Sequence, residues 1–174
     1  MLHQHPQYSD HYFNAKTKEI CRVWINKKGN RKVKVKKMVP NRNGYLTFKI
    51  YLGNNKYKFF TAHRFMAECL AGRRLRKNEH IDHIDQDPYN NTLSNLRIVS
   101  RSANRLNTDK SRGFFAYETK TKGTVYQVWF RSVYQGQYDT EEEAKQVHEA
   151  LRQAALEAEL DGVITLQQMI EEVA

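Results

Sequence analysis

The chain has 174 residues, enough for one domain with a sizeable core or for two small ones. Its formal net charge is +10: residues 1–110 hold 23 Lys and Arg against 8 Asp and Glu, whereas residues 111–174 hold 6 against 11. We therefore expect a polyanionic partner, nucleic acid first, and the two cysteines exclude a zinc ribbon or a disulfide framework.

The first ten residues are polar and lack the apolar stretch of a signal peptide. The chain is therefore expected to work in the cytoplasm where it is made, and no segment predicts a membrane partner. We expect His3 and His5 to lie in a frayed polar tail rather than in a metal site.

Residues 12–60 predict a small antiparallel sheet, because short alternating runs are separated by turn formers such as Asn43-Gly44. Between Lys27 and Lys37 there are seven basic residues and no acid, and three of them share one strand face: Lys32, Lys34 and Lys36. Lysines of this kind are typical of a solvated edge strand. Contact with phosphate is an equal alternative, since no acid balances them.

Residues 63–70 predict a helix with an apolar stripe, ended by Gly72. A basic run, residues 73–77, follows it. Such a run is either a solvated loop or a grip on backbone phosphates, with Arg73 and Arg74 as the candidates for the second role.

Residues 79–107 predict a hairpin followed by a helix. Residues 80–84 alternate like a strand, residues 85–92 are rich in turn formers, residues 96–99 form a second strand, and Ser100 is placed to cap a helix through Leu106. The hairpin is expected to pack on that helix.

This segment carries the parts that cleavage of a phosphodiester needs: a base to deprotonate water and a cation to stabilise negative charge. His83 is a candidate base, since an unperturbed histidine has a pKa of about 6.5. Asp82 lies beside it and Asn104 lies on the following helix, so that their oxygens could meet at one ion. Carboxylate and amide oxygens suit Mg²⁺ or Mn²⁺ better than zinc.

The spacing of Asp82-His83, Asn90-Asn91, residues 93–97 and Asn104 resembles the HNH signature of phage homing endonucleases, and residues 63–67 resemble the helix before it. The resemblance implies a ββα-metal fold, with His83 as general base and with Asp82 and Asn104 as ligands of Mg²⁺ or Mn²⁺. It also implies that Asn95 ties down the hairpin loop and orients His83. His63 and Asn107 are expected to serve packing or capping, with contact to the site or to DNA as the alternative.

Two positions depart from that pattern. Many members have histidine where Asn104 stands, and the Asn form resembles enzymes that nick one strand. Gln86 occupies a turn position where relatives often have glycine, so that a positive φ there would be strained.

Residues 111–174 predict a second module, with strands over residues 114–118, 125–132 and 134–138 and a helix that starts with the capping box of Thr140 and Glu143. We expect the apolar residues between Val163 and Ile170 to pack on this module as a short helix. Residues 134–144 resemble the plant ethylene-response-factor (APETALA-two) DNA-binding domain, in which the sheet enters the major groove.

That resemblance gives the contact candidates Arg112, Lys120, Lys122, Gln127, Trp129 and Arg131. Gln127, Trp129 and Arg131 share one strand face. Trp129 could equally be the core aromatic beneath the helix, which would remove all three from the contact face.

The sequence thus predicts an α+β protein with a nuclease domain over residues 1–110 and a DNA-binding domain over residues 111–174. The expected activity is metal-dependent, site-selective cleavage of double-stranded DNA, with nicking of one strand, by a phage-encoded monomer in the bacterial host cytoplasm that needs no small-molecule cofactor. The rivals are a DNA-binding regulator with an inactive nuclease centre and an RNA-associated protein.

Overall fold

The computed structural model of the chain describes residues 1–108, 111–121 and 123–172. It is a mixed α and β structure of small antiparallel sheets and few helices, which agrees with the predicted class. The chain forms two compact units: Met1–Arg101 together with the segment from Val163 onward, and Ser102–Gly162. Among the described helices, none is long and apolar enough to cross a membrane.

Two sheets, rather than the single one that we predicted, open the first unit. Strands β1 (Leu2–Gln4), β2 (His11–Asn14), β3 (Glu19–Ile25) and β4 (Arg31–Val35) pair in sequence order. Strands β5 (Val39–Pro40), β6 (Leu46–Gly53) and β7 (Lys56–Thr61) form the other. Pro40 has no N–H for a ladder, so the short strand that contains it suits the sheet edge where it lies.

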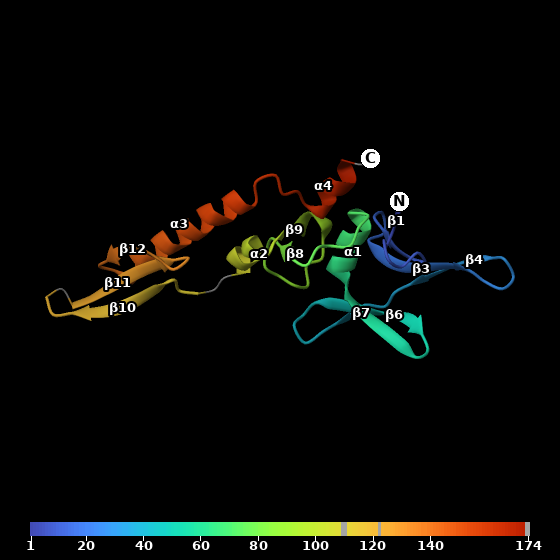
Figure 1. Cartoon of the computed structure of the whole chain (residues 1–174), viewed down its shortest axis with the longest axis horizontal. Coiled ribbons are helices and arrows are strands. Elements are labelled where there is room, and N and C mark those ends of the chain that lie inside the picture. Colours follow the sequence, from blue (N-terminus) through green and yellow to red (C-terminus); the bar gives the residue numbers. More distant parts are fainter. Residues whose placement is uncertain (109–110, 122, 173–174) are drawn as a thin grey trace. The chain divides into compact units, whose positions relative to one another are not determined.

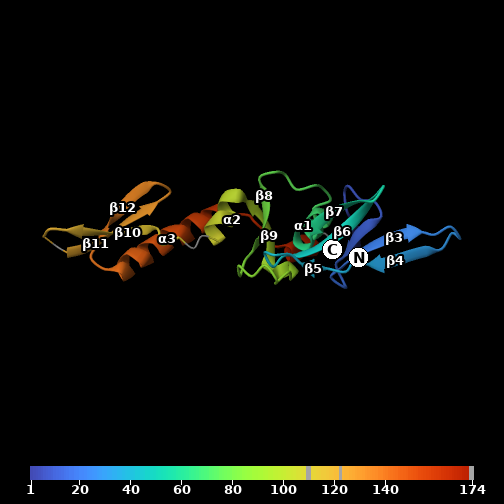
Figure 2. The ribbon, with the colours of Figure 1, turned by 90° about the horizontal axis from the view of Figure 1, so that it is seen from below.

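Helix α1 (Ala62–Leu70) begins directly after β7 and lies against the core of this unit. Its apolar stripe is the predicted one: Phe65, Met66 and Cys69 are buried, and Gly72 follows with a φ of 63°. Phe48, Ile50 and Phe60 contribute the facing side of the β5–β7 sheet to the same core. Figure 2 shows α1 next to β6 and β7. The other face of that sheet, with Phe59 at its centre, is exposed.

The N-terminal residues form strand β1 and His5 is buried, so the predicted frayed tail is wrong. His5 is 1% exposed, stacks on Phe65 with ring centroids 4.4 Å apart, and lies 3.0 Å from the fully buried Glu68 carboxylate. The N–H of Gln7 donates to Nδ1 of His5, so Nε2 carries the proton that is donated to Glu68. A histidine in a polar segment can thus be a core residue when a buried carboxylate accepts its hydrogen bond.

Strands β8 (Glu79–His83) and β9 (Leu96–Ser100) form the predicted hairpin, with a 3₁₀ turn, η1 (Leu93–Asn95), before β9. Leu93 and Leu96 are buried in the core of the first unit. Helix α2 (Arg101–Thr108) follows β9 without a loop. The order in the chain is therefore strand, strand, helix, as predicted.

The C-terminal helix α4 (Leu166–Glu171) packs on the first unit, not on the second module as we predicted. Leu166 is fully buried with Phe65 and Leu93, and Met169 and Ile170 lie against the same cluster. An isolated antiparallel bridge joins Thr165 to Arg97 of β9, and Figure 1 shows α4 beside α1. The apolar side chains of α4 are thus buried against α1, η1 and β9 of the first unit.

The second unit is a three-stranded sheet against one long helix. Strands β10 (Phe114–Thr119), β11 (Gly123–Phe130) and β12 (Val133–Tyr138) pair in order, and α3 (Glu141–Glu159) lies along one face (Figure 1). Phe114 and Val128 pack against Ala144 of α3. The predicted capping box is confirmed, because Thr140 accepts from the Glu143 N–H and Glu143 accepts from the Thr140 N–H. The unit includes α2 from Ser102 onward, and the Arg152 side chain of α3 donates to the Leu106 carbonyl of α2 at 2.6 Å.

Candidate active site

The end of β8 buries an acid and a base next to each other in the chain. Asp82 is 1% exposed and His83 is 7% exposed. Adjacent strand residues point to opposite faces, so each side chain has its own surroundings. The register of the hairpin sets Arg97 opposite Asp82, and the Arg97 guanidinium donates to Asp82 Oδ2 from Nε at 2.8 Å, with Nη2 at 2.7 Å.

Arg97 is a site residue to which the sequence interpretation gave no role. Its side chain is largely buried, and it fixes the orientation of the Asp82 carboxylate through two nitrogens. Counting back along a two-stranded hairpin from its loop would have set Arg97 opposite Asp82, so the register of the predicted strands already contained the signal.

The His83 ring lies with two aromatic side chains of the first unit. Its centroid is 5.2 Å from that of His63 on α1 and 5.9 Å from that of Tyr45 before β6. Burial lowers the pKa of His83 below 6.5, and the Asn91 side chain and the nearby charges of Asp82 and Asp85 oppose that shift. His83 is therefore neutral at neutral pH and can accept a proton, and the surrounding carboxylates stabilise the imidazolium that results.

His63 is held neutral. Burial, followed by repulsion from a protonated His83 and from Arg64, lowers its pKa to about 3. Its ring therefore adds no charge beside His83 at neutral pH. The His63 ring thus packs in the core and also touches the candidate base, and Tyr45 contacts it from a segment that the sequence did not single out.

Asn95 ties down the loop between β8 and β9. Its Nδ2 donates to Asp85 Oδ1 at 2.8 Å and to the Asn90 carbonyl at 2.9 Å, and its Oδ1 accepts from the Asp85 N–H at 3.1 Å. Asp85 also accepts from Asn90 Nδ2. Both ends of the loop are thus joined through one amide, directly after His83.

Gln86 has a φ of 63°, the positive value that we had expected to strain a non-glycine residue at this turn. Its N–H donates to the His83 carbonyl at 2.9 Å, so the turn closes immediately behind the candidate base. The left-handed conformation costs a non-glycine residue on the order of 1 kcal/mol, and the Asn95 hydrogen bonds hold it in place.

The loop network makes Asn95 a test of local order. Asn95→Ala removes three hydrogen bonds from a partly buried loop, and we expect a loss of stability of about 1–3 kcal/mol. Amide hydrogen exchange should speed up at Ile84 and Asp85 while α1 keeps its protection. The control is the exposed Asn78→Ala, and equal exchange rates in the two variants would refute the loop role.

The oxygen donors suit a hard divalent cation. Within residues 1–108, 111–121 and 123–172, no three His, Cys, Asp or Glu side chains gather closely enough to hold a metal ion by themselves. Mg²⁺ needs no such group, since it keeps several waters and is bound by one or two protein oxygens plus phosphate. Asp82 is buried and paired with Arg97, and Asn104, half-buried on α2, belongs to the second unit, so the role of both as ligands of one ion stays a prediction.

The basic candidates of the first unit differ in how they are held. Lys32 and Lys34 on the exposed β4 stand opposite Trp24 and Arg22 of β3, whereas Lys36 donates to the Lys49 carbonyl. Arg73 makes two hydrogen bonds to the Glu79 carboxylate, and Arg74 bonds Gln7 and lies 3.6 Å from Glu68. The lysines of β4 thus present their charge to solvent, while the two arginines are partly neutralised within the chain.

The second unit answers the question about Trp129. Val128 and Phe130 face α3, so Trp129 lies on the open face of the sheet with Gln127 and is 41% exposed. Arg131 does not share that face, because it lies in the turn after β11 with a φ of 51° and pairs with Glu159. Arg112 and Lys120 are exposed, and Lys122 lies outside the described residues.

Comparison with known proteins bears on the same segment. Residues 60–106 match the family model described as HNH endonuclease. Searches of curated proteins and of solved structures gave no match. The matched residues run from the end of β7 to α2 and include Asp82, His83, Asn95 and Asn104. The segment that carries the candidate site is therefore similar to an HNH endonuclease domain, which supports a nuclease, a hydrolase that acts on nucleic acid.

Proposed function

We propose that the protein is a metal-dependent, site-selective DNA endonuclease of the phage homing type that nicks one strand of double-stranded DNA. The observation that carries this proposal is the buried His83, neutral and backed by carboxylates, at the end of a hairpin whose loop is locked by Asn95. It lies inside the segment that matches the HNH endonuclease model.

In the proposed reaction, His83 accepts a proton from the water that attacks the scissile phosphate. Asp82 and Asn104 are the residues that would hold Mg²⁺ or Mn²⁺, with Asp82 oriented by Arg97. A divalent cation bound there supplies positive charge to the phosphorane and the leaving oxygen. Asn95 keeps the His83 backbone in place, and the neutral His63 adds no competing charge. The products are a 5′-phosphate and a 3′-hydroxyl.

We propose that Ser102–Gly162 contains an ethylene-response-factor-like DNA-binding fold that directs the nuclease to its site. Two observations support this. The sheet has one face covered by α3 and one open face, and the open face carries the exposed Phe115, Tyr117, Trp129 and Tyr134. Residues 111–138 hold four basic residues and one acid, whereas residues 139–174 hold two and ten, so the sheet is the side that suits a polyanion.

The test is incubation of the purified protein with supercoiled DNA that contains the genomic sequence on either side of the gene for this protein. The reaction is run in Mg²⁺ or Mn²⁺ and in EDTA. We expect open circles only when metal is present, because one strand is cut. Linear product would mean paired cuts and would correct the nicking proposal. Tight binding without cleavage in either metal would contradict the nuclease and favour a DNA-binding regulator, while stronger competition by RNA than by duplex DNA would favour an RNA partner.

A further inference from the structure

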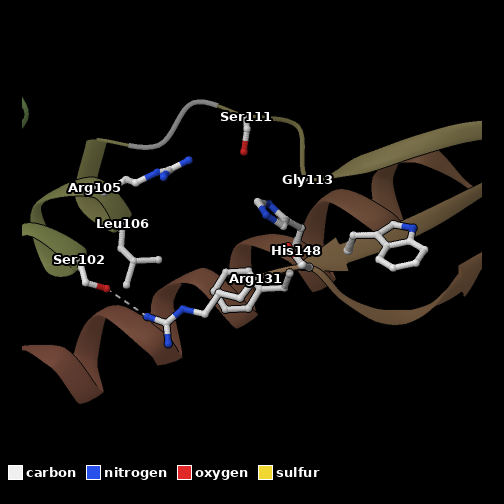
Figure 3. A pocket seen from close by; sticks show the side chains of 10 residues that line it. Ser102, Arg105, Leu106, Ser111, Gly113, Arg131 and His148 are labelled. Atoms are coloured by element: carbon white, nitrogen blue, oxygen red, sulfur yellow. Dashed lines mark hydrogen bonds between the residues drawn. The ribbon is translucent and has the colours of Figure 1, made fainter.

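The second unit contains a pocket that the proposed chemistry does not use. It lies where α2, the residues before β10 and the turn after β11 come together, and its volume is about 380 Å³. The polar side chains that line it are those of Ser102, Arg105, Ser111, Arg131, Ser132 and His148. Figure 3 shows the Arg105 guanidinium, the Ser111 hydroxyl and the His148 ring turned toward its interior.

The lining has the composition of an oxyanion site. It offers two guanidinium groups, one imidazole and three hydroxyls, and no carboxylate is among the lining residues. Over residues 1–108, 111–121 and 123–172, no carboxylate pairs with Arg105. Guanidinium and hydroxyl groups are the donors that proteins use for phosphate oxygens. Helix α3 of the same unit is rich in Glu, so the absence of carboxylates among the lining residues contrasts with the rest of the unit.

The walls of the pocket are held in place. Arg152 of α3 bonds the Leu106 carbonyl and so fixes the end of α2. His148 of α3 is 6% exposed, and a Cβ added at Gly113 would lie 2.0 Å from its ring. Gly113, with a φ of 68°, is therefore the residue that lets the chain pass this close to the imidazole.

Arg131 is available to a ligand at low cost. Its Nη2 lies 3.2 Å from Glu159 and 3.4 Å from Ser102 Oγ, and its side chain is 52% exposed. Exposed ion pairs of this kind are weak, since water screens them and both side chains lose freedom. A phosphate bound in the pocket could thus replace Glu159 as the ion-pair partner of Arg131.

We propose that this pocket seats one phosphate group of the nucleic-acid backbone, an inference that rests on the proposed DNA substrate. Arg105 follows Asn104 on α2, and consecutive residues of a helix point about 100° apart. The pocket would therefore place a contact to a DNA phosphate on the same helix as the proposed metal ligand Asn104. It adjoins the open face of the sheet, because Trp129, which lies on that face, also lines the pocket.

The test measures the affinity of the full chain for duplex DNA by fluorescence anisotropy in EDTA at several salt concentrations. Each phosphate contact contributes about 0.9 to the slope of log affinity against log salt. Arg105→Ala should lower the slope by about one contact, and Ser102→Asp, which suits the first turn of a helix but adds negative charge, should also weaken binding. Lys145→Ala on the exposed side of α3 loses the same charge and should leave the slope unchanged.

A second arm separates the sources of phosphate. Inorganic phosphate is titrated at constant ionic strength while the amide signals of Ser102, Arg105 and Gly113 are followed by NMR. An unchanged slope in Arg105→Ala overturns the backbone seat, and saturation by inorganic phosphate would then identify a pocket for a free anion. If the wild-type chain does not cleave DNA but its salt slope still differs from that of Arg105→Ala, the nuclease proposal is contradicted and the phosphate pocket is not.

Discussion

His83→Ala should bind duplex DNA as the wild-type protein does and should nick it about 10²- to 10⁴-fold more slowly. The base is removed, while Asp82, Arg97 and the Asn95 loop keep their contacts. Single-turnover nicking rates in Mn²⁺, measured beside anisotropy titrations in EDTA, separate the chemical step from binding.

The matched control for that variant is His80→Ala. His80 is a half-buried histidine on the same strand, and it makes no ring contact with His63 or Tyr45. It should cut within a few-fold of the wild-type rate. A His83→Ala protein that cuts at the wild-type rate would remove His83 from the role of base, and slow cutting by both variants would point to damage to the hairpin instead.

Glu68→Ala should destabilise the first unit by about 1–3 kcal/mol, because it leaves buried hydrogen-bond donors without their acceptor. Glu68 is fully buried and accepts from His5 Nε2 at 3.0 Å and from the Leu75 N–H at 3.2 Å, with Arg64 3.2 Å away. Without it, those donors lose their acceptor inside the core. Urea unfolding followed by circular dichroism measures the change, and Glu19→Ala, an exposed residue at the start of β3, is the control.

The pH dependence of the Glu68 contribution has a definite sign. Burial alone would raise the pKa of this carboxyl, but the hydrogen bonds from His5 and the Leu75 N–H, with the charges of Arg74 and Arg64, bring it below 4.5. The ionised form therefore stabilises the fold above pH 4.5, and this contribution is lost as the pH falls through the lowered value. The gap in stability between the wild type and Glu68→Ala should narrow in acid, and a gap that is constant from pH 7 to pH 3 would contradict the charged pair.

The hairpin that carries the candidate site was predictable because its residues are local in sequence. Asp82, His83, Asn95 and the turn at Gln86 lie within one hairpin, where strand register and turn geometry follow from the residue pattern. The helix of residues 62–70 and the capping box at Thr140 were predictable for the same reason. Such features depend on neighbours a few residues away, so tertiary contacts do not change them.

The rest depended on partners far apart in the chain. Nothing in a polar N-terminus indicates that His5 meets Glu68, 63 residues later, or that α4 returns to a core built from residues 13–96. Periodicity likewise could not say which face of β11 meets α3, and so whether Trp129 is covered. The sequence by itself determined the elements, the charge and the HNH segment, because these depend on local spacing. The tertiary structure alone decided which polar groups are buried and paired, because burial depends on whichever distant segments have apolar surface left to cover.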